Sequence, residues 1–123
     1  MPSHAAPAVR SVWRIFLNRA SSWPGEWRIY RVEPFPVSGD PASTLRRLRN
    51  AVAAMPRTRI ETATESYLHA VCRTRFLNFR DDLEFRYSAA EHVVHVRSAS
   101  RWGIFDFGVN RRRIERVRQG LRG

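Results

Sequence analysis

Lysine is absent from this sequence of 123 residues, so all 22 of its basic side chains are arginines. They outnumber 11 acidic residues and leave a formal net charge of +11 at pH 7. The lack of lysine is typical of a GC-rich genome, but such a bias does not explain the excess of bases over acids. That excess predicts attraction to anions, namely nucleic acid, anionic headgroups or acidic proteins.

Cysteine and long apolar runs are scarce as well. Cys72 is the one cysteine, which excludes an intramolecular disulfide and a zinc site built from several cysteines. No apolar run approaches the ~20 residues of a membrane span, and the N-terminus lacks the apolar stretch of a secretory signal. With 43% hydrophobic residues, the chain is typical of a folded globular protein. We therefore predict a cytoplasmic protein, free or on the cytoplasmic face of a membrane, with no metal and no cofactor.

The positive charge is concentrated at the two ends of the chain. Residues 1–31 carry a net +4, residues 32–60 carry +3 and residues 107–123 carry +5. Residues 61–106 sum to −1, because six arginines there face seven acids. We expect the central arginines to pair with acids and the terminal ones to form a contact surface.

Hydrophobic periodicity predicts an α+β fold. Asp40 as N-cap and Pro41 at the first helical position mark a helix that ends before Pro56. Beyond residue 58 the pattern alternates, and strands are predicted over 59–62, 67–76, 83–87 and 92–101. Asn110 is expected to cap a last helix. The prediction is a single small domain with an antiparallel sheet of three to five strands flanked by two helices.

Two faces follow from the alternation. Within 67–76, one face is expected to hold Leu68, Ala70, Cys72, Thr74 and Phe76. Adjacent Asp81 and Asp82 are expected to diverge if their segment is a strand.

The first 40 residues are predicted to be an arm and a proline-rich linker, followed by the α+β domain over 41–123. Within the arm we expect a short helix over 11–20 and an extended segment over 27–32. Aromatic and arginine side chains interleave along it: Trp13, Arg14, Phe16, Arg19, Trp23, Trp27, Arg28 and Tyr30. Because tryptophan and arginine are enriched at interface hot spots, this arm indicates docking onto a larger protein complex. Tryptophan is also common at membrane surfaces, so that complex, or the contact itself, could be membrane-bound. The alternative is that the rings cover the sheet.

Three polar segments, over 81–85, 97–103 and 106–114, carry a resemblance. The matching residues are Asp81, Asp82, Glu84, Phe85, Arg97, Ser98, Ser100, Arg101, Gly103, Asp106, Gly108, Asn110 and Arg113. With this pattern the chain resembles the domain of unknown function 1499 family over about residues 41–122. That family occurs in bacteria and in plastid-bearing eukaryotes and has no established reaction. The resemblance therefore implies where a site lies and not what it does.

The polar residues of these segments allow two interpretations. Arg111, Arg112 and Arg113 would occupy the first turn of the last helix, where the macrodipole disfavours cations by roughly 0.3–1 kcal/mol each. We expect carboxylate partners for them among Asp81, Asp82, Glu84 and Asp106. The set would then be an internal network with Arg97 that holds the 102–109 loop. The other interpretation is an anion pocket for phosphate or carboxylate, formed by Ser98, Ser100, Arg101 and the amides from Asn110 onward.

Catalytic patterns are weak. Ser98 and Ser100 lack the glycine-flanked elbow of an esterase, and no phosphate-cradling glycine loop occurs. His92 and His95 are three residues apart and would point to opposite faces of a strand. We therefore predict a non-enzymatic binding or assembly module, an accessory subunit that docks through its arm. The alternatives are an anion-binding domain or, ranked lower, a nucleic-acid-binding protein; an enzyme ranks last.

Overall fold

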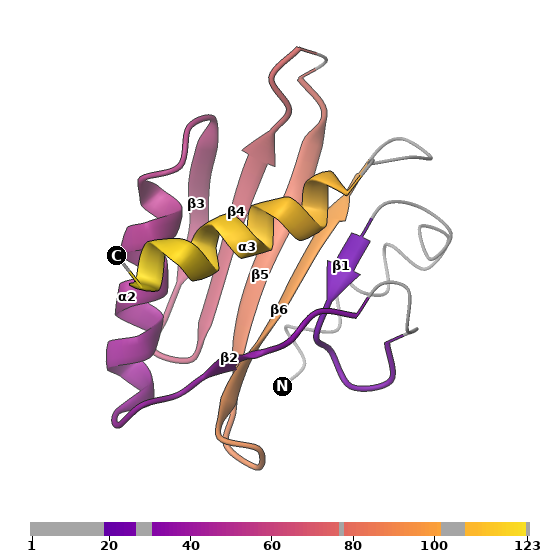
Figure 1. The fold of residues 1–123 in the computed structure, drawn as a ribbon. Helices are drawn as coiled ribbons and strands as arrows, with labels where there is room; N and C mark the ends of the chain where they lie inside the picture. The colour runs from indigo at the N-terminus through magenta and orange to yellow at the C-terminus, as the bar shows by residue number, and fades with distance from the viewer. Residues whose placement is uncertain (1–18, 27–30, 77, 102–107, 123) are drawn as a thin grey trace.

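In the computed structural model, the residues described are 19–26, 31–76, 78–101 and 108–122. They form two helices and one six-stranded sheet (Figure 1). The elements in chain order are β1 (Arg19–Ser21), β2 (Phe35–Pro36), α2 (Pro41–Ala53), β3 (Thr58–Ala63), β4 (Tyr67–Arg73), β5 (Arg80–Ser88), β6 (Val93–Ser100) and α3 (Val109–Arg122). The predicted class, a small α+β domain with an antiparallel sheet and two helices, is confirmed.

The sheet is a meander with two short strands added at one edge. Strands β3 to β6 pair antiparallel in sequence order, and β1 and β2 both pair with the outer edge of β6. Six strands therefore form where three to five were predicted. An unpaired edge exposes a row of backbone N–H and C=O groups, and β1 and β2 supply partners for that row.

Both helices lie on one face of the sheet (Figure 1). Asp40 caps α2 by accepting a hydrogen bond from the Ala42 amide at 3.2 Å, and the helix ends before Pro56 as expected. Its buried Leu48 and Val52 pack in one cluster with Ile114 of α3. The sheet contributes alternate residues to this core: Leu68, Ala70, Cys72, Leu83, Phe85, Val94 and Val96. The inward face predicted for residues 67–76 is thus confirmed at Leu68, Ala70 and Cys72.

Phe76 does not join that face. Strand β4 ends at Arg73, so Phe76 lies in the turn that follows, where its side chain is 88% exposed. The strand predicted over 67–76 is therefore three residues too long, because a turn breaks the alternation at residue 74.

The N-terminal segment differs most from its prediction. Arg19–Ser21 is a strand and not the end of a helix, because pairing with β6 and burial of Ala20 stabilise the extended form. Residues 11–18 and 27–30 lie outside the described residues. The proline-rich linker contributes Phe35 to the core, where its ring meets that of Phe85 edge-on with centroids 5.6 Å apart.

Helix α3 begins at Val109, two residues earlier than an Asn110 cap would place it. The Arg112 amide donates to the Gly108 carbonyl at 2.9 Å, so Gly108 takes the cap position, with a φ of +79° that glycine adopts readily. Asn110 lies within the first turn and turns its side chain to the sheet. In the described ranges no helix is long and apolar enough to cross a bilayer.

Candidate functional site

The sheet divides the predicted polar residues between its two faces. Since successive side chains of a strand alternate, Asp81 faces the helices and its neighbour Asp82 faces away from them. The cross-strand register extends this division over β6, because Asp81 pairs with Ser100 and Glu84 pairs with Arg97. The sequence suggests a single network of these polar residues. In the structure they instead form two clusters, one on each face of the sheet.

The inner cluster lies between the sheet and the start of α3. It consists of Asp81, Ser98, Ser100, Asn110 and Arg113. Arg113 Nη1 donates to Ser98 Oγ at 3.0 Å and to Asn110 Oδ1 at 2.8 Å. Ser98 donates to the same Asn110 oxygen at 2.6 Å, and Asn110 Nδ2 donates to Ser100 at 3.2 Å. These contacts occupy the serines that were candidate anion ligands.

Asp81 is the charged member of the inner cluster. Its side chain is 1% exposed, and its Oδ2 lies 2.7 Å from Arg113 Nη2. This contact is an ion pair outside hydrogen-bond angles, and within the described residues neither Asp81 oxygen accepts a hydrogen bond. The buried carboxylate therefore depends on Arg113 for its compensation.

The outer cluster lies on the face of the sheet opposite α2 and α3 and contains two sets of contacts, which we call rungs. In each rung a β5 carboxylate contacts one β4 side chain and one side chain that lies on β6 or, in the case of Arg101, directly after it. In the first rung Arg101 donates to Asp82 through Nε at 2.9 Å and Nη2 at 2.8 Å, and His69 Nε2 lies 2.8 Å from Asp82 Oδ1. In the second, Tyr67 Oη donates to Glu84 at 2.6 Å, while Arg97 lies 3.6 Å from the other Glu84 oxygen.

The pKa of Asp82 lies well below its usual range. Burial alone would raise it, but the hydrogen bonds and charges of His69 and Arg101 outweigh burial and favour the ionised form. His69 and Tyr67 were not among the predicted site residues. The signal for them was their position on the face of β4 opposite α2 and α3. Their partners are diagonal neighbours on β5, since the register sets His69 opposite Glu84 and Tyr67 opposite Arg86.

Arg111 lies apart from both clusters. The exposed Arg111 donates through Nη1 to the Arg31 carbonyl at 3.1 Å and so contacts the N-terminal segment. Asp106 lies outside the described residues.

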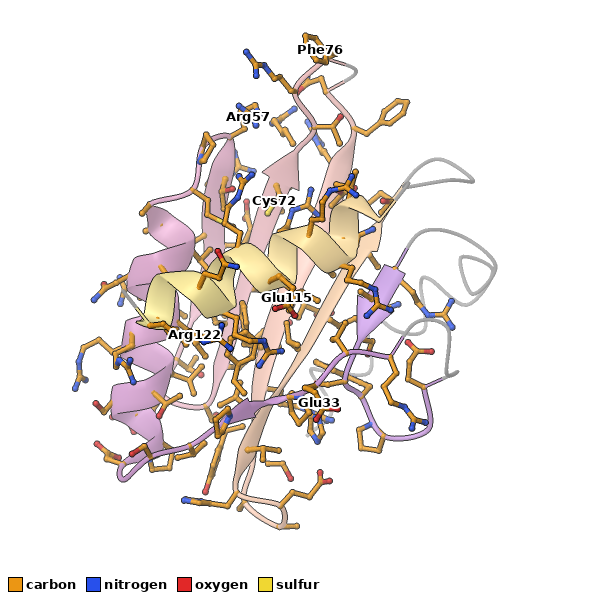
Figure 2. All side chains as sticks on the ribbon, in the orientation of Figure 1. Glu33, Arg57, Cys72, Phe76, Glu115 and Arg122 are labelled. Atoms are coloured by element: carbon orange, nitrogen blue, oxygen red, sulfur yellow. The ribbon has the colours of Figure 1, made fainter. Side chains whose placement is uncertain are left out.

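A cavity of about 240 Å³ lies where the end of α2, the neighbouring ends of β3 and β4, and the start of α3 meet. Figure 2 labels Arg57 at this end of the molecule and Cys72 on β4. Half of the twelve residues that line this cavity are arginines, and none of the twelve is acidic. The arginines are Arg57, Arg73, Arg75, Arg112, Arg113 and Arg116. We call this the arginine cavity.

Most of this positive charge is uncompensated within the part of the chain that is described. Arg113 pairs with Asp81, whereas Arg57, Arg73, Arg75 and Arg116 form no ion pair with a described carboxylate. Guanidinium groups gathered around one hollow produce a positive potential that favours an anion there. Of the six, the sequence prediction included Arg113 as a site residue and Arg112 in the helix turn. Arg116 lies one turn further along the same helix. Arg57, Arg73 and Arg75 come from two other segments, whose proximity to this helix the sequence does not show.

Cys72 also lines the arginine cavity. Burial raises the pKa of its thiol, and this effect exceeds the opposing charge of Arg113. The neutral thiol is therefore the favoured form, which makes Cys72 a poor nucleophile.

Two residues of the predicted docking arm are described, and both have intramolecular contacts. Arg19 donates through Nε and Nη2 to both carboxylate oxygens of Glu26, at 3.0 and 2.9 Å. The Arg86 guanidinium lies 4.8 Å from the ring centroid of Trp23. The other arm residues lie outside the described ranges: Trp13, Arg14, Phe16, Trp27, Arg28 and Tyr30.

His95 holds the segment after β1 against the sheet. Its Nδ1 lies 3.1 Å from Ser22 Oγ, and its Nε2 lies 2.6 Å from Glu91. This combination of residue types resembles a hydrolase triad. Ser22, however, is buried and its Oγ accepts the Val96 amide at 2.7 Å, so the hydroxyl is engaged with backbone. His92 precedes β6, in a turn, with a φ of 55°.

The fold and the site define a class of protein: a small α+β domain with both helices on one face of an antiparallel sheet and an arginine-lined cavity at one end. The chain belongs to the family described as "Protein of unknown function (DUF1499)", whose sequence profile matches residues 16–121. The predicted family is thereby confirmed. The match begins before residue 41 and includes β1 and β2. Comparison with curated proteins gave no match.

Proposed function

We propose that this protein is a binding domain for a ligand that carries phosphate or carboxylate groups, held in the arginine cavity. The observation that supports the proposal is the composition of the lining: six arginines and no carboxylate. Guanidinium groups bind such oxyanions through paired, charge-assisted hydrogen bonds.

The proposed site differs from the one that the sequence suggested. Ser98 and Ser100 are bonded to Asn110, and Arg101 is bonded to Asp82. We therefore propose that the anion lies in the arginine cavity, beside the first turns of α3, and not between α3 and the sheet. Arg113 belongs both to this cavity and to the inner cluster.

The chemistry of the lining favours binding over catalysis. None of the twelve lining residues is a histidine or a carboxylate that could act as a general acid or base. The nucleophile available, Cys72, is 3% exposed and its pKa is raised. We accordingly propose a non-enzymatic role.

The test uses the double variant Arg57→Gln/Arg116→Gln and calorimetric titration with pyrophosphate and with citrate. Both arginines are exposed, so their replacement should leave the fold intact. We expect at least a tenfold loss of affinity, about the effect of one lost charged hydrogen bond.

The matched control is Arg46→Gln/Arg122→Gln, which removes the same charge from exposed positions outside the arginine cavity. It should bind both probes almost as the wild type does. The proposal would be contradicted if the two double variants lost affinity for the probes equally, or if the wild type bound neither probe.

Docking of the N-terminal arm onto a larger, membrane-associated complex in the cytoplasm remains a second prediction. Its test is a deletion that ends before Arg19, because β1 pairs with β6 and buries Ala20 in the core. We expect a chain lacking residues 1–18 to stay folded and to lose a partner that co-purifies with the full chain. Unchanged co-purification would argue against docking through residues 1–18.

A further inference from the structure

We propose that the anion in the arginine cavity is the phosphate of a lipid headgroup, and that the β4–β5 hairpin tip enters the surface of an anionic bilayer beside it. The tip is defined by Thr74, Arg75, Phe76, Asn78 and Phe79. This inference rests on the proposed function, because it names the ligand of the same site.

The first argument is the exposure of the tip. Phe76 is 88% and Phe79 37% exposed, and they are the large hydrophobic side chains that stand open to solvent in the described part of the chain. Phe76 points away from the body of the molecule at the far end of the hairpin (Figure 2). A phenylalanine in this position gains free energy when it leaves water for an apolar phase.

The second argument is that the tip holds its shape without a partner. The Thr74 amide donates to the Phe79 carbonyl at 2.9 Å, and the Phe79 amide donates to Thr74 Oγ1 at 2.8 Å. Asn78 adopts a φ of 57° and its amide donates to the Thr74 carbonyl. Because these bonds already join the described residues at the two ends of the turn, insertion would cost those residues little conformational entropy.

The third argument is the charge around the tip. Arg73, Arg75 and Arg80 flank the aromatic residues, and residues 73–80 contain no acid. The Arg75 guanidinium lies 5.4 Å from the Phe76 ring centroid. Arginine side chains near an apolar surface extend their charged ends to the headgroup level, where anionic lipids attract them.

The arginine cavity and the tip are continuous. Thr74 and Arg75 belong to the tip and also line the cavity, as does Arg73 directly before them. A bilayer that accepts Phe76 would therefore bring headgroup phosphates to the cavity, and both contacts could form together.

A single-stranded nucleic acid is the competing anion, with bases stacked on exposed rings. Such binders combine a groove that follows the backbone with a series of aromatic platforms. Here Phe76 stands on a convex tip, and Phe79 is only 37% exposed. This shape favours insertion into a surface over stacking along a groove.

The experiment is co-sedimentation of the full chain with vesicles of phosphatidylcholine plus phosphatidylglycerol and with vesicles of phosphatidylcholine alone. We expect the wild type to bind the anionic vesicles, and Phe76→Ser to bind them about tenfold more weakly, the expected loss for one phenylalanine left in water. Phe76→Leu should retain most of the binding. Pyrophosphate affinity should be the same in Phe76→Ser and the wild type, since Phe76 does not line the cavity.

The outcomes separate the inference from the proposed function. Arg57→Gln/Arg116→Gln should weaken both pyrophosphate and vesicle binding, while Arg46→Gln/Arg122→Gln should weaken neither by much. Pyrophosphate binding without vesicle binding would overturn the lipid inference and leave the proposed function standing. A wild type that binds neither pyrophosphate nor anionic vesicles would overturn both the lipid inference and the proposed function. Unchanged vesicle binding by Phe76→Ser, or an oligonucleotide that binds tightly and needs Phe76, would also overturn the lipid inference.

Discussion

Replacing Arg113 with alanine should lower the free energy of unfolding by about 3–5 kcal/mol, the usual cost of removing one partner of a buried ion pair. The side chain of Asp81 is 1% exposed and that of Arg113 is 10% exposed. The variant would leave a carboxylate in the core with no described hydrogen-bond donor. Urea denaturation followed by circular dichroism measures the loss.

The neighbouring helix position supplies the control for Arg113. Arg116→Ala removes an exposed arginine from the same helix and should change the unfolding free energy by less than about 0.5 kcal/mol. The double variant Arg113→Met with Asp81→Leu should regain much of the stability, because it no longer buries a carboxylate without an oppositely charged partner. If Arg113→Ala is as stable as the wild type, the inner cluster is not a structural network.

The second large effect is expected at Asp82 and depends on pH. Asp82→Asn should destabilise the fold near neutral pH by roughly 1.5–3 kcal/mol, the range for hydrogen bonds to a charged group. It removes the charge that Arg101 and His69 contact at 2.8–2.9 Å. Unfolding measured from pH 7 down to pH 2 shows both the loss and its pH dependence.

The sign of that dependence follows from the depressed pKa. Asp82 keeps its charge in the folded state at pH values where an unfolded aspartate, with a pKa of about 3.9, has become protonated. Its contribution is therefore complete above about pH 5 and is lost as the pH falls toward the folded-state pKa. The difference in unfolding free energy between the wild type and Asp82→Asn should therefore become smaller as the pH is lowered.

An exposed carboxylate provides the comparison for Asp82. Glu61 pairs with Arg59, whose side chain is 72% exposed, and such surface pairs contribute little. Glu61→Gln should leave both the stability and its pH dependence nearly unchanged. A wild type and an Asp82→Asn variant with parallel pH profiles would show that the first rung does not stabilise the fold.

These two predictions bear on the interpretations that the sequence left open. The inner and outer clusters are rich in internal contacts, which supports the structural network for Asp81, Asp82, Ser98, Asn110 and Arg101. Our proposed anion site is instead the arginine cavity, where the described lining holds positive charge without acids. A structural network and an anion site can therefore coexist, sharing Arg113.

Local sequence patterns were sufficient for the elements that carry strong periodicity. The helix from Asp40 to Pro56 and the inward faces of β4, β5 and β6 follow from cap chemistry and from alternation of apolar residues. Strands β1 and β2 could not be predicted in this way. They contain three and two residues, and what holds them extended is pairing with β6, which comes some 60 to 80 residues later in the chain.

The sequence by itself determined the charge, the family and the polar residues of the two clusters other than His69 and Tyr67. It also contained the reason for their separation, because adjacent Asp81 and Asp82 must diverge in a strand. Only the tertiary structure decided where arginines, the sole basic residues of this lysine-free chain, gather without acidic partners among the described residues. Arg57, Arg75 and Arg116 meet around one cavity because a meander of strands and a returning helix bring distant segments to the same end of the sheet. No local sequence pattern predicts this proximity, because it results from backbone pairing and core packing and not from the arginines themselves.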